Sequence, residues 1–420
     1  MLRSRFGTVI SLCVIVFLVQ TVDASDWPQF RGPGGSGISE AKNLPVTWSE
    51  TENVAWKTAM PGYGASSPIA LDGKLYVTCY SGYGMGRNQG RMEDLTFHVV
   101  CVDSQTGKIL WGKKIKPILP ESKKVRDHGY AAQTPVTDGE HLYVFLGKTG
   151  VFKFDLNGNQ IWQTSVGTKV HGWGSGTSPI LYKDLLIVNA SVESQTLVAL
   201  DRATGKVKWR AGDIKESWNT PLITTTQNGR RELVLAMKGK VLGFEPDAGR
   251  LLWSSDTDIR WYMTPSLVAA RGVVYALGGR SGTAALAVRT GGSGDVTATH
   301  RLWTSTKGSN VSSPVILNGY LYWMHEQRGI AFCARAATGE IVYEQRLPGA
   351  RQVYASALLA DGRLYYLDRT GKTFVLAAKP KFEQLACNTL DDRSTFNASP
   401  IVCDGALILR SDENMYCIKK

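Results

Sequence analysis

The strongest constraint on the fold is a phrase that the sequence repeats. The segment CVDSQTGKILW ends at Trp111, and VALDRATGKVKW ends at Trp209 with the same Asp, Thr-Gly-Lys and Trp at the same spacing. Related segments end at Trp162, Trp253 and Tyr343. Internal repetition of this kind indicates a chain of similar supersecondary units, each of which buries its apolar faces against its neighbours.

A second pattern counts the units. A small polar residue followed by Pro or Ala recurs, mostly at intervals of 42 to 49 residues, with one interval of 67. The sequence therefore predicts eight units, with insertions between the first and the second. The anchor positions are Pro68, Pro135, Pro179, Pro221, Pro265, Pro314, Ala357 and Pro400.

Each unit has the pattern of four antiparallel strands. After the anchor, an apolar run meets a turn, often Asp-Gly or Asn-Gly, and a β-rich run such as LYV follows, which is a strong hairpin signal. A third strand leads to the Thr-Gly turn, and a fourth ends at the aromatic residue. Four such strands make one propeller blade. The sequence predicts an all-β fold, a single eight-bladed β-propeller of four-stranded antiparallel blades over residues 51–420.

Ring closure and blade packing follow from the same pattern. The last unit has only three strands, and an open edge there would invite aggregation. The segment NVAWKTAM is the expected fourth strand, so an N-terminal strand closes the ring. Large rings at the ends of fourth strands are expected to pack between blades. These docking residues are Trp56, Trp111, Trp162, Trp209, Trp253, Trp303 and Tyr343.

The N-terminus has the features of an export signal. Arg3 and Arg5 precede an apolar run, and small residues around Ala24 offer a cleavage site. Residues 1–24 are interpreted as a signal peptide and residues 25–50 as an N-terminal leader. We expect a periplasmic or secreted protein without a transmembrane domain after removal of the signal. An uncleaved or lipidated N-terminus is the alternative.

Six of the seven cysteines lie outside the signal. An exported protein can form disulfides, and Cys79 with Cys101 is the best candidate pair because the two lie on neighbouring predicted strands. The alternative is that the cysteines are buried free thiols on apolar strands.

The TP or SP phrases, together with D-x-x-T-G-K-x-x-W, resemble the pyrroloquinoline-quinone (PQQ)-like repeat family of eight-bladed propellers. The resemblance covers nearly the whole chain after the signal, and in size and layout the chain is similar to BamB-type propellers. The leader DWPQFRGPGGSGIS looks like the opening of PQQ-like propellers from planctomycetes and related bacteria, which implies a bacterial envelope protein. Because the family also contains quinoprotein dehydrogenases, PQQ with calcium is the alternative to a chain without a cofactor.

The candidate site is one mouth of the propeller. In a four-stranded blade, the loop before the first strand and the loop between the second and third strands open on the same face. Loops there carry aromatic, basic and imidazole groups, which suit a planar anion, a sugar chain or an extended peptide. The alternative is that the rings plug the channel. The candidates are Tyr63, Arg126, His128, Tyr130, His171, Trp173, Trp218, Arg260, Trp261, Tyr262, Arg351, Tyr354, Arg393 and Phe396.

No catalytic or metal-binding motif is found, because the six histidines show neither HExxH nor zinc-ligand spacing. The leading hypothesis is a monomeric, non-catalytic binding or scaffold protein for an envelope protein or an anionic polymer, because no catalytic group is recognised. The net charge of +12 would attract anionic partners, but the Lys and Arg residues are spread along the whole chain, which favours a dispersed, solubilising charge. A specific nucleic-acid partner is not expected. The alternatives are a PQQ-dependent dehydrogenase with the quinone in the mouth, and a polysaccharide-binding propeller.

Overall fold

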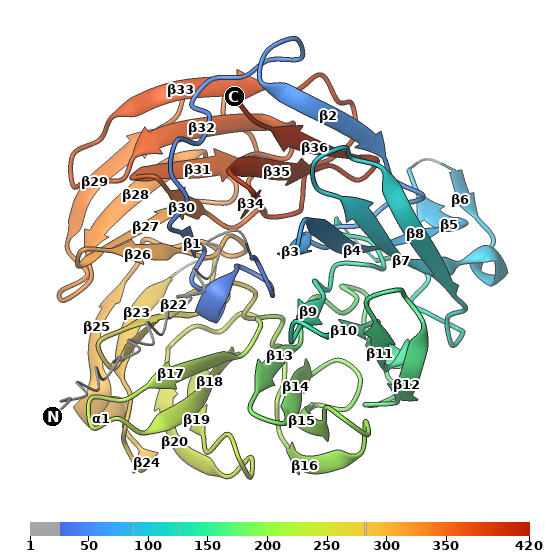
Figure 1. Cartoon of the computed structure of the whole chain (residues 1–420). Helices are drawn as coiled ribbons and strands as arrows, with labels where there is room; N and C mark the ends of the chain where they lie inside the picture. The colour runs from blue at the N-terminus through green and yellow to red at the C-terminus, as the bar shows by residue number, and fades with distance from the viewer. Residues whose placement is uncertain (1–25, 87, 126, 281, 283) are drawn as a thin grey trace, which may run out of the picture.

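The computed structural model of the protein describes residues 26–86, 88–125, 127–280, 282 and 284–420. Eight antiparallel sheets stand around a common axis like the blades of a propeller (Figure 1). Each blade has four antiparallel strands from one stretch of the chain, except the last, which joins one N-terminal strand to three C-terminal strands. Two blades gain a short parallel strand at one edge. The eight-bladed fold that the repeat predicts is confirmed.

The first strand of each blade lies nearest the axis and the fourth lies at the rim (Figure 1). Blades one to four contain β3 (Ile69–Leu71), β4 (Lys74–Ser81), β7 (Thr96–Asp103) and β8 (Ile109–Ile115); β9 (Val136–Thr137), β10 (His141–Phe145), β11 (Val151–Asp155) and β12 (Gln160–Thr164); β13 (Ile180–Tyr182), β14 (Leu185–Ala190), β15 (Thr196–Asp201) and β16 (Val207–Ala211); and β17 (Leu222–Thr225), β18 (Arg231–Met237), β19 (Lys240–Phe244) and β20 (Leu251–Asp256).

Blades five to eight follow the same order. They contain β21 (Val268–Ala270), β22 (Val273–Leu277), β23 (Ala285–Arg289) and β25 (Arg301–Ser305); β26 (Val315–Leu317), β27 (Tyr320–Met324), β28 (Ile330–Arg335) and β29 (Ile341–Arg346); β30 (Leu358–Ala360), β31 (Arg363–Leu367), β32 (Lys372–Ala377) and β33 (Gln384–Thr389); and β34 (Ile401–Cys403), β35 (Ala406–Arg410), β36 (Asn414–Ile418) and β2 (Val54–Ala59).

Short elements decorate the ring. The first insertion forms the hairpin β5 (Tyr83–Met85) and β6 (Asn88–Gly90) and the 3-10 turn η2 (Met92–Asp94), and η3 (Gly147–Thr149) precedes β11. The loop after β23 adds β24 (Gly294–Asp295) to the rim of blade four, and α1 (Thr297–His300) follows it. With α1 at four residues, no helix in the described ranges is long enough to cross a bilayer.

The expected closure is present. Strand β2 pairs antiparallel with β36, from Val54 opposite Ile418 to Ala59 opposite Asn414. The Lys419 amide donates to the Asn53 carbonyl at 2.9 Å, which extends the pairing beyond the strand. The N-terminal strand therefore completes the eighth blade and covers the edge that would otherwise stay open.

One anchor differs from its prediction. In blade five, Leu267 and not Pro265 occupies the position directly before the first strand, since β21 begins at Val268. In the sequence TPSL the proline, Pro265, precedes the small polar residue, Ser266, instead of following it. The anchor predicted from the proline therefore lies two residues before the true position.

The leader lies in the central channel and plugs it. Trp27 pairs with Ala70, the Pro28 carbonyl accepts from Thr137, and β1 (Ile38–Ser39) pairs in parallel with β30, so the leader touches blades one, two and seven. Figure 1 shows this blue segment running into the middle of the ring. Because three blades hold it, the leader is an integral part of the propeller.

Close packing explains the unusual leader composition. The Arg31 side chain is buried and its Nη2 donates to the carbonyls of Ser36 and Pro314, which ties the leader to blade six. Burial lowers the pKa of Arg31 to about 9, so the guanidinium remains charged at neutral pH. A Cβ at Gly32, where φ is +69°, would lie 2.8 Å from the Trp27 ring. Only glycine fits there.

The hydrophobic core lies between blades, where fourth-strand rings pack on the turn of the next blade. Trp56 and Trp303 show the arrangement: each Nε1 donates at 2.9 Å to a carbonyl of the following blade, Ser104 or Ala336. The rings of Trp111, Trp162 and Trp209 likewise cover Gly158, Gly205 and Gly249. Tyr343 contacts Phe382 of the next blade. Trp253 differs, because its Nε1 donates to Glu232 within its own blade.

The disulfide prediction is wrong. Cys79 and Cys101 are both buried free thiols. In the β4/β7 register, Cys79 lies opposite His98 and Cys101 lies opposite Tyr76. This offset of three residues puts the two side chains on opposite faces of the sheet, since strand side chains alternate. Cys79 therefore packs toward blade eight and Cys101 toward blade two.

Candidate functional site: the mouth of the propeller

A closed ring of eight hydroxyl groups encircles the channel. The residue two positions before each first strand is Ser or Thr, and its backbone N–H donates to the hydroxyl oxygen of the equivalent residue in the next blade at 2.9 to 3.4 Å. Ser399 donates back to Ser67 and completes the circle. The members are Ser67, Thr134, Ser178, Thr220, Ser266, Ser313, Ser356 and Ser399. This hydroxyl ring also connects every blade to its neighbour.

A cavity of about 370 Å³ lies above the hydroxyl ring at the mouth. Its wall follows a simple rule, because the residue two positions before each ring hydroxyl lines it in all eight blades: Ala65, Ala132, Gly176, Trp218, Thr264, Val311, Tyr354 and Asn397. Side chains of an extended chain alternate, so positions separated by two face the same side. The segments before the first strands are therefore the inner wall of the mouth.

The leader supplies the floor. Phe30 lines the mouth cavity and also a second cavity of about 200 Å³ that contacts Gln29 and Arg31. The leader pairs with Ala70, Thr137 and Leu359, each three residues beyond a ring hydroxyl. This corresponds to about 10 Å farther along the first strands. The mouth is thus a blind cavity, closed below by the plug.

Aromatic rings concentrate on one side of the mouth, over blades three to five. The Tyr262 ring lies at the centre of the cluster, with the centroid of Trp173 at 5.8 Å and that of Trp218 at 5.6 Å. The Tyr262 hydroxyl accepts from Arg280 at 3.3 Å and from Asn310 at 3.4 Å. The Trp218 indole donates to the Gly174 carbonyl at 2.8 Å. These bonds fix the rings as a rigid apolar wall.

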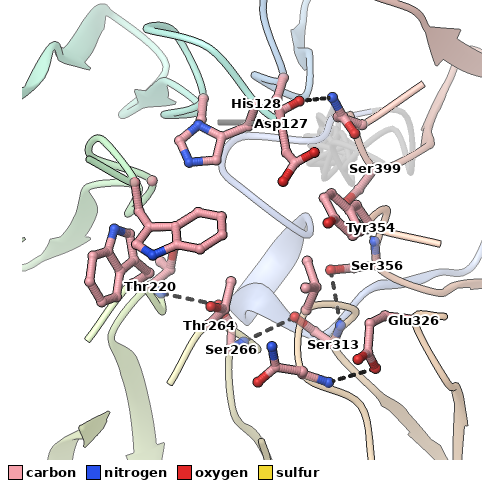
Figure 2. Close-up of a pocket in the computed structure, with 18 of the residues that line it drawn as sticks. Asp127, His128, Thr220, Thr264, Ser266, Ser313, Glu326, Tyr354, Ser356 and Ser399 are labelled. Atoms are coloured by element: carbon pink, nitrogen blue, oxygen red, sulfur yellow. Dashed lines mark hydrogen bonds between the residues drawn. The ribbon is translucent and has the colours of Figure 1, made fainter. Parts of the chain in front are cut away.

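The second insertion, between β8 and β9, reaches across to the opposite side. Asp127 receives a hydrogen bond and ion pair from Arg369 at 3.2 Å, and its carbonyl accepts from Asn397 at 2.7 Å. The Arg369 guanidinium lies 4.4 Å from the centroid of Tyr354. Figure 2 shows Asp127 above the cavity, bonded to this far wall. The insertion is therefore a strap that blades seven and eight anchor.

The described lining carries few charges. They are the carboxylates of Asp127 and Glu326 and the guanidinium of Arg280. Glu326 is buried and accepts the Asn310 backbone N–H at 2.9 Å (Figure 2). Desolvation lowers the pKa of His128, which leaves that imidazole neutral at pH 7. With Arg369 paired to Asp127, positive and negative groups nearly balance.

Several predicted site residues lie outside the cavity. Phe396 is fully buried against Tyr416, and Tyr130 packs on Tyr80 and Tyr83. Both rings pack against strand residues and do not line the cavity. Tyr63 donates to Glu413 at 2.6 Å. His171 stacks edge-on against Trp218, and its own contacts belong to a small neighbouring cavity.

The arginines that were expected to line the mouth do not line it in the structure. Arg260, Arg351 and Arg393 are exposed and do not line the cavity, and Trp261 is 40% exposed outside it with Arg280 over its ring. These residues stand five or six positions before the ring hydroxyls, where the loops have already turned outward. Arg126 lies outside the described residues. Of the predicted residues, His128, Trp173, Trp218, Tyr262 and Tyr354 meet in the cavity.

Sequence reasoning missed most of the polar lining. Asn397 could have been found, since it precedes a ring hydroxyl by two residues. Arg280, Glu326 and Gln327 come from loops between second and third strands, and no repeated motif marks them. No group of three His, Cys, Asp or Glu side chains in the described ranges is arranged to hold a metal ion.

The fold and its mouth define an eight-bladed propeller of the PQQ-like class. A sequence model of the family described as outer membrane protein assembly factor BamB matches residues 96–345, more than half of the chain. The chain therefore belongs to this family. No curated protein matches it in sequence.

Solved structures share the architecture at low identity. The quinohemoprotein alcohol dehydrogenase from Comamonas testosteroni aligns with a TM-score of 0.67 and 12% identity over 94% of this chain and 81% of its own. BamB from Moraxella catarrhalis aligns with a TM-score of 0.60 and 11% identity, over 87% of this chain and 99% of its own. A europium-containing methanol dehydrogenase aligns with a TM-score of 0.62 and 12% identity, over 92% of this chain and 89% of its own. At these identities the likeness concerns the fold alone.

Proposed function

We propose that this protein is a non-catalytic binding protein of the bacterial cell envelope that takes a segment of a partner or polymer into its mouth. The observation that carries the proposal is the blind, aromatic-walled cavity above the hydroxyl ring. Loops on a rigid scaffold are a common place for binding. Membership of a family described by an outer-membrane assembly factor supports an envelope location, as does the signal-like N-terminal sequence.

The chemistry of the lining favours binding over catalysis. Both carboxylates of the lining are already engaged: Asp127 is paired with Arg369, and Glu326 accepts a backbone N–H. Seven of the lining hydroxyls belong to the blade-to-blade ring, and in the described residues no histidine is bonded to these seven. An activated nucleophile requires an adjacent base.

The quinoprotein alternative rests on two structural relatives whose names are those of dehydrogenases. PQQ is a flat tricarboxylate, and its binding would call for several cations or a metal ion. The described lining instead offers one guanidinium, Arg280, beside two carboxylates, Asp127 and Glu326. Buried acceptor oxygens of Asn310 and Asn397 would add repulsion. The residues present do not fit this cofactor.

Site-specific photocross-linking tests the binding proposal. A photoreactive phenylalanine analogue is placed at Trp173, inside the mouth, and at Ile161, a 50% exposed position on a rim strand, in the bacterium that encodes the protein. We expect adducts from position 173 and none above background from position 161. Equal yields at both positions, or none at either, would contradict a mouth-directed partner.

Native mass spectrometry with PQQ and calcium tests the alternative. We expect no stoichiometric mass shift at high micromolar cofactor, because the lining charges oppose a tricarboxylate. A calcium-dependent one-to-one shift would replace the binding proposal with the quinoprotein one.

A further inference from the structure

The mouth cavity contains polar atoms that the protein itself leaves unpaired. The side-chain oxygens of Asn310 and Asn397 are buried acceptors without a hydrogen-bond partner in the described structure. Asn310 is 1% exposed and Asn397 is 8% exposed, and both line the cavity. Unpaired buried polar atoms are rare in proteins and call for a partner.

The hydroxyl ring offers the complementary groups. Seven of its members line the cavity, and in the described structure each accepts one backbone N–H while donating its own O–H to no protein acceptor. A hydroxyl carries one donor and two acceptor sites. The floor of the mouth is therefore surrounded by O–H groups that are free to donate, such as those of Ser313 and Ser356 in Figure 2.

Apolar surfaces complete the site. Phe30 lines the cavity at the plug, and Trp173, Trp218 and Tyr262 form the aromatic wall. The cavity thus combines aromatic faces with donors and acceptors, while its charges are nearly balanced. Such a site is poorly matched to a strongly charged ligand, which would leave a desolvated charge unpaired.

Resting on the proposed binding function, we propose that the mouth cavity binds a pyranose unit of a carbohydrate. A pyranose has C–H faces that stack on aromatic rings and a rim of hydroxyls that both donate and accept. Its acceptors would meet the hydroxyl ring, and its donors would meet the oxygens of Asn310 and Asn397 once rotation of these side chains exposes them. A cavity of about 370 Å³ falls within the range of small-ligand pockets.

Saturation-transfer NMR on the purified protein tests the proposal. The probes are glucose, galactose, mannose and N-acetylglucosamine, each used alone, with the open-chain polyol sorbitol as the control ligand. We expect at least one pyranose to bind with a Kd of about 1 mM, the range for a ligand of this size. Sorbitol should give no signal, because it lacks a ring face to stack.

Matched tryptophan variants locate the binding. W173A should lower the affinity for the responding pyranose about tenfold, because the variant loses a stacking surface. W173F should restore most of that affinity. W261A is the control, since Trp261 is exposed and outside the cavity. Equal weakening by W173A and W261A would overturn the assignment of the sugar to the mouth.

The outcomes separate this inference from the broader function. Cross-links at position 173 together with no pyranose signal would overturn the carbohydrate assignment and leave a protein partner at the mouth. Absence of both would overturn the two proposals together. A sorbitol signal equal to that of the pyranoses would also contradict the proposal, because it would show polyol binding without ring stacking.

Discussion

At five blade junctions a fourth-strand indole packs on the next blade. The ring covers a glycine turn of the next blade, and in four of these five its Nε1 also donates to a carbonyl there, as Trp303 does to Ala336. Trp209 makes the packing contact on Gly249, but its Nε1 has no partner in the described structure. The two positions therefore separate packing from hydrogen bonding.

We predict that W303F costs more stability than W209F. Both substitutions shrink the ring, but only W303F leaves the buried Ala336 carbonyl without its donor. The difference in unfolding free energy should be about 1 kcal/mol. Urea unfolding followed by circular dichroism measures it. Equal losses would mean that the hydrogen bond contributes nothing net.

Glu193 makes stability depend on pH. It is buried in blade three, where it accepts from the Ser175 hydroxyl, and desolvation raises its pKa to about 7. A raised folded-state pKa means that the folded protein holds a proton that the unfolded chain releases near pH 4.5. Its contribution is therefore lost as the pH rises from about 4.5 to 7.

We predict that E193Q removes this part of the pH dependence. At pH 8 the variant should be more stable than the parent by a difference on the order of 3 kcal/mol, and at pH 4 the two should be similar. Thermal unfolding measured at both values decides this. A constant difference at the two pH values would contradict the raised pKa.

The parity of a position decides whether an aromatic residue lines the mouth or the core. Tyr354 stands two residues before its ring hydroxyl and faces the cavity, whereas Phe396 stands three before its own and packs inside blade eight. Both residues lie in loops that precede a first strand, but their side chains point to different sides of the chain. Repeat motifs locate the strands, and so parity could have sorted these two. The polar groups of Glu326 and Arg280 follow no repeat and required the structure.

Among the elements, β2 has the largest consequence for the fold. The repeat and the missing fourth strand of the last unit were sufficient to predict it. The plug function of the leader was not predictable in the same way, because its contacts with Ala70 and Leu359 join segments that are distant in sequence.

We predict that a chain beginning at Met60 aggregates, whereas one beginning at Asp26 stays monomeric. The shorter chain lacks both plug and β2, so β36 presents an open edge and the Trp56 ring no longer covers blade one. Size-exclusion chromatography of the two purified proteins tests this. A soluble, monomeric shorter chain would show that ring closure is dispensable.

Across the whole molecule, the hydroxyl ring and the closing strand make the repeat array circular. An open array of repeats has ends at which unfolding can begin, since each unit touches only its neighbours. Here Ser399 donates to Ser67, and β2 completes blade eight, so both ends of the array are engaged. Every blade therefore has a neighbouring blade on both sides.

We predict a single unfolding transition for the whole propeller. Circular dichroism and tryptophan fluorescence in urea should give coincident curves, because twelve tryptophans spread over the ring report on many blades. Two separated transitions would contradict circular cooperativity.

The position of β2 also fixes when the mouth can come into being during synthesis. Its wall includes residues from Ala65 to Ser399, and the strand that completes the ring, β2, waits for β36 at residues 414–418. A nascent chain emerging from a ribosome therefore has no assembled cavity until residue 418 is out. The wall of the mouth is therefore completed in one step, when β2 pairs with β36.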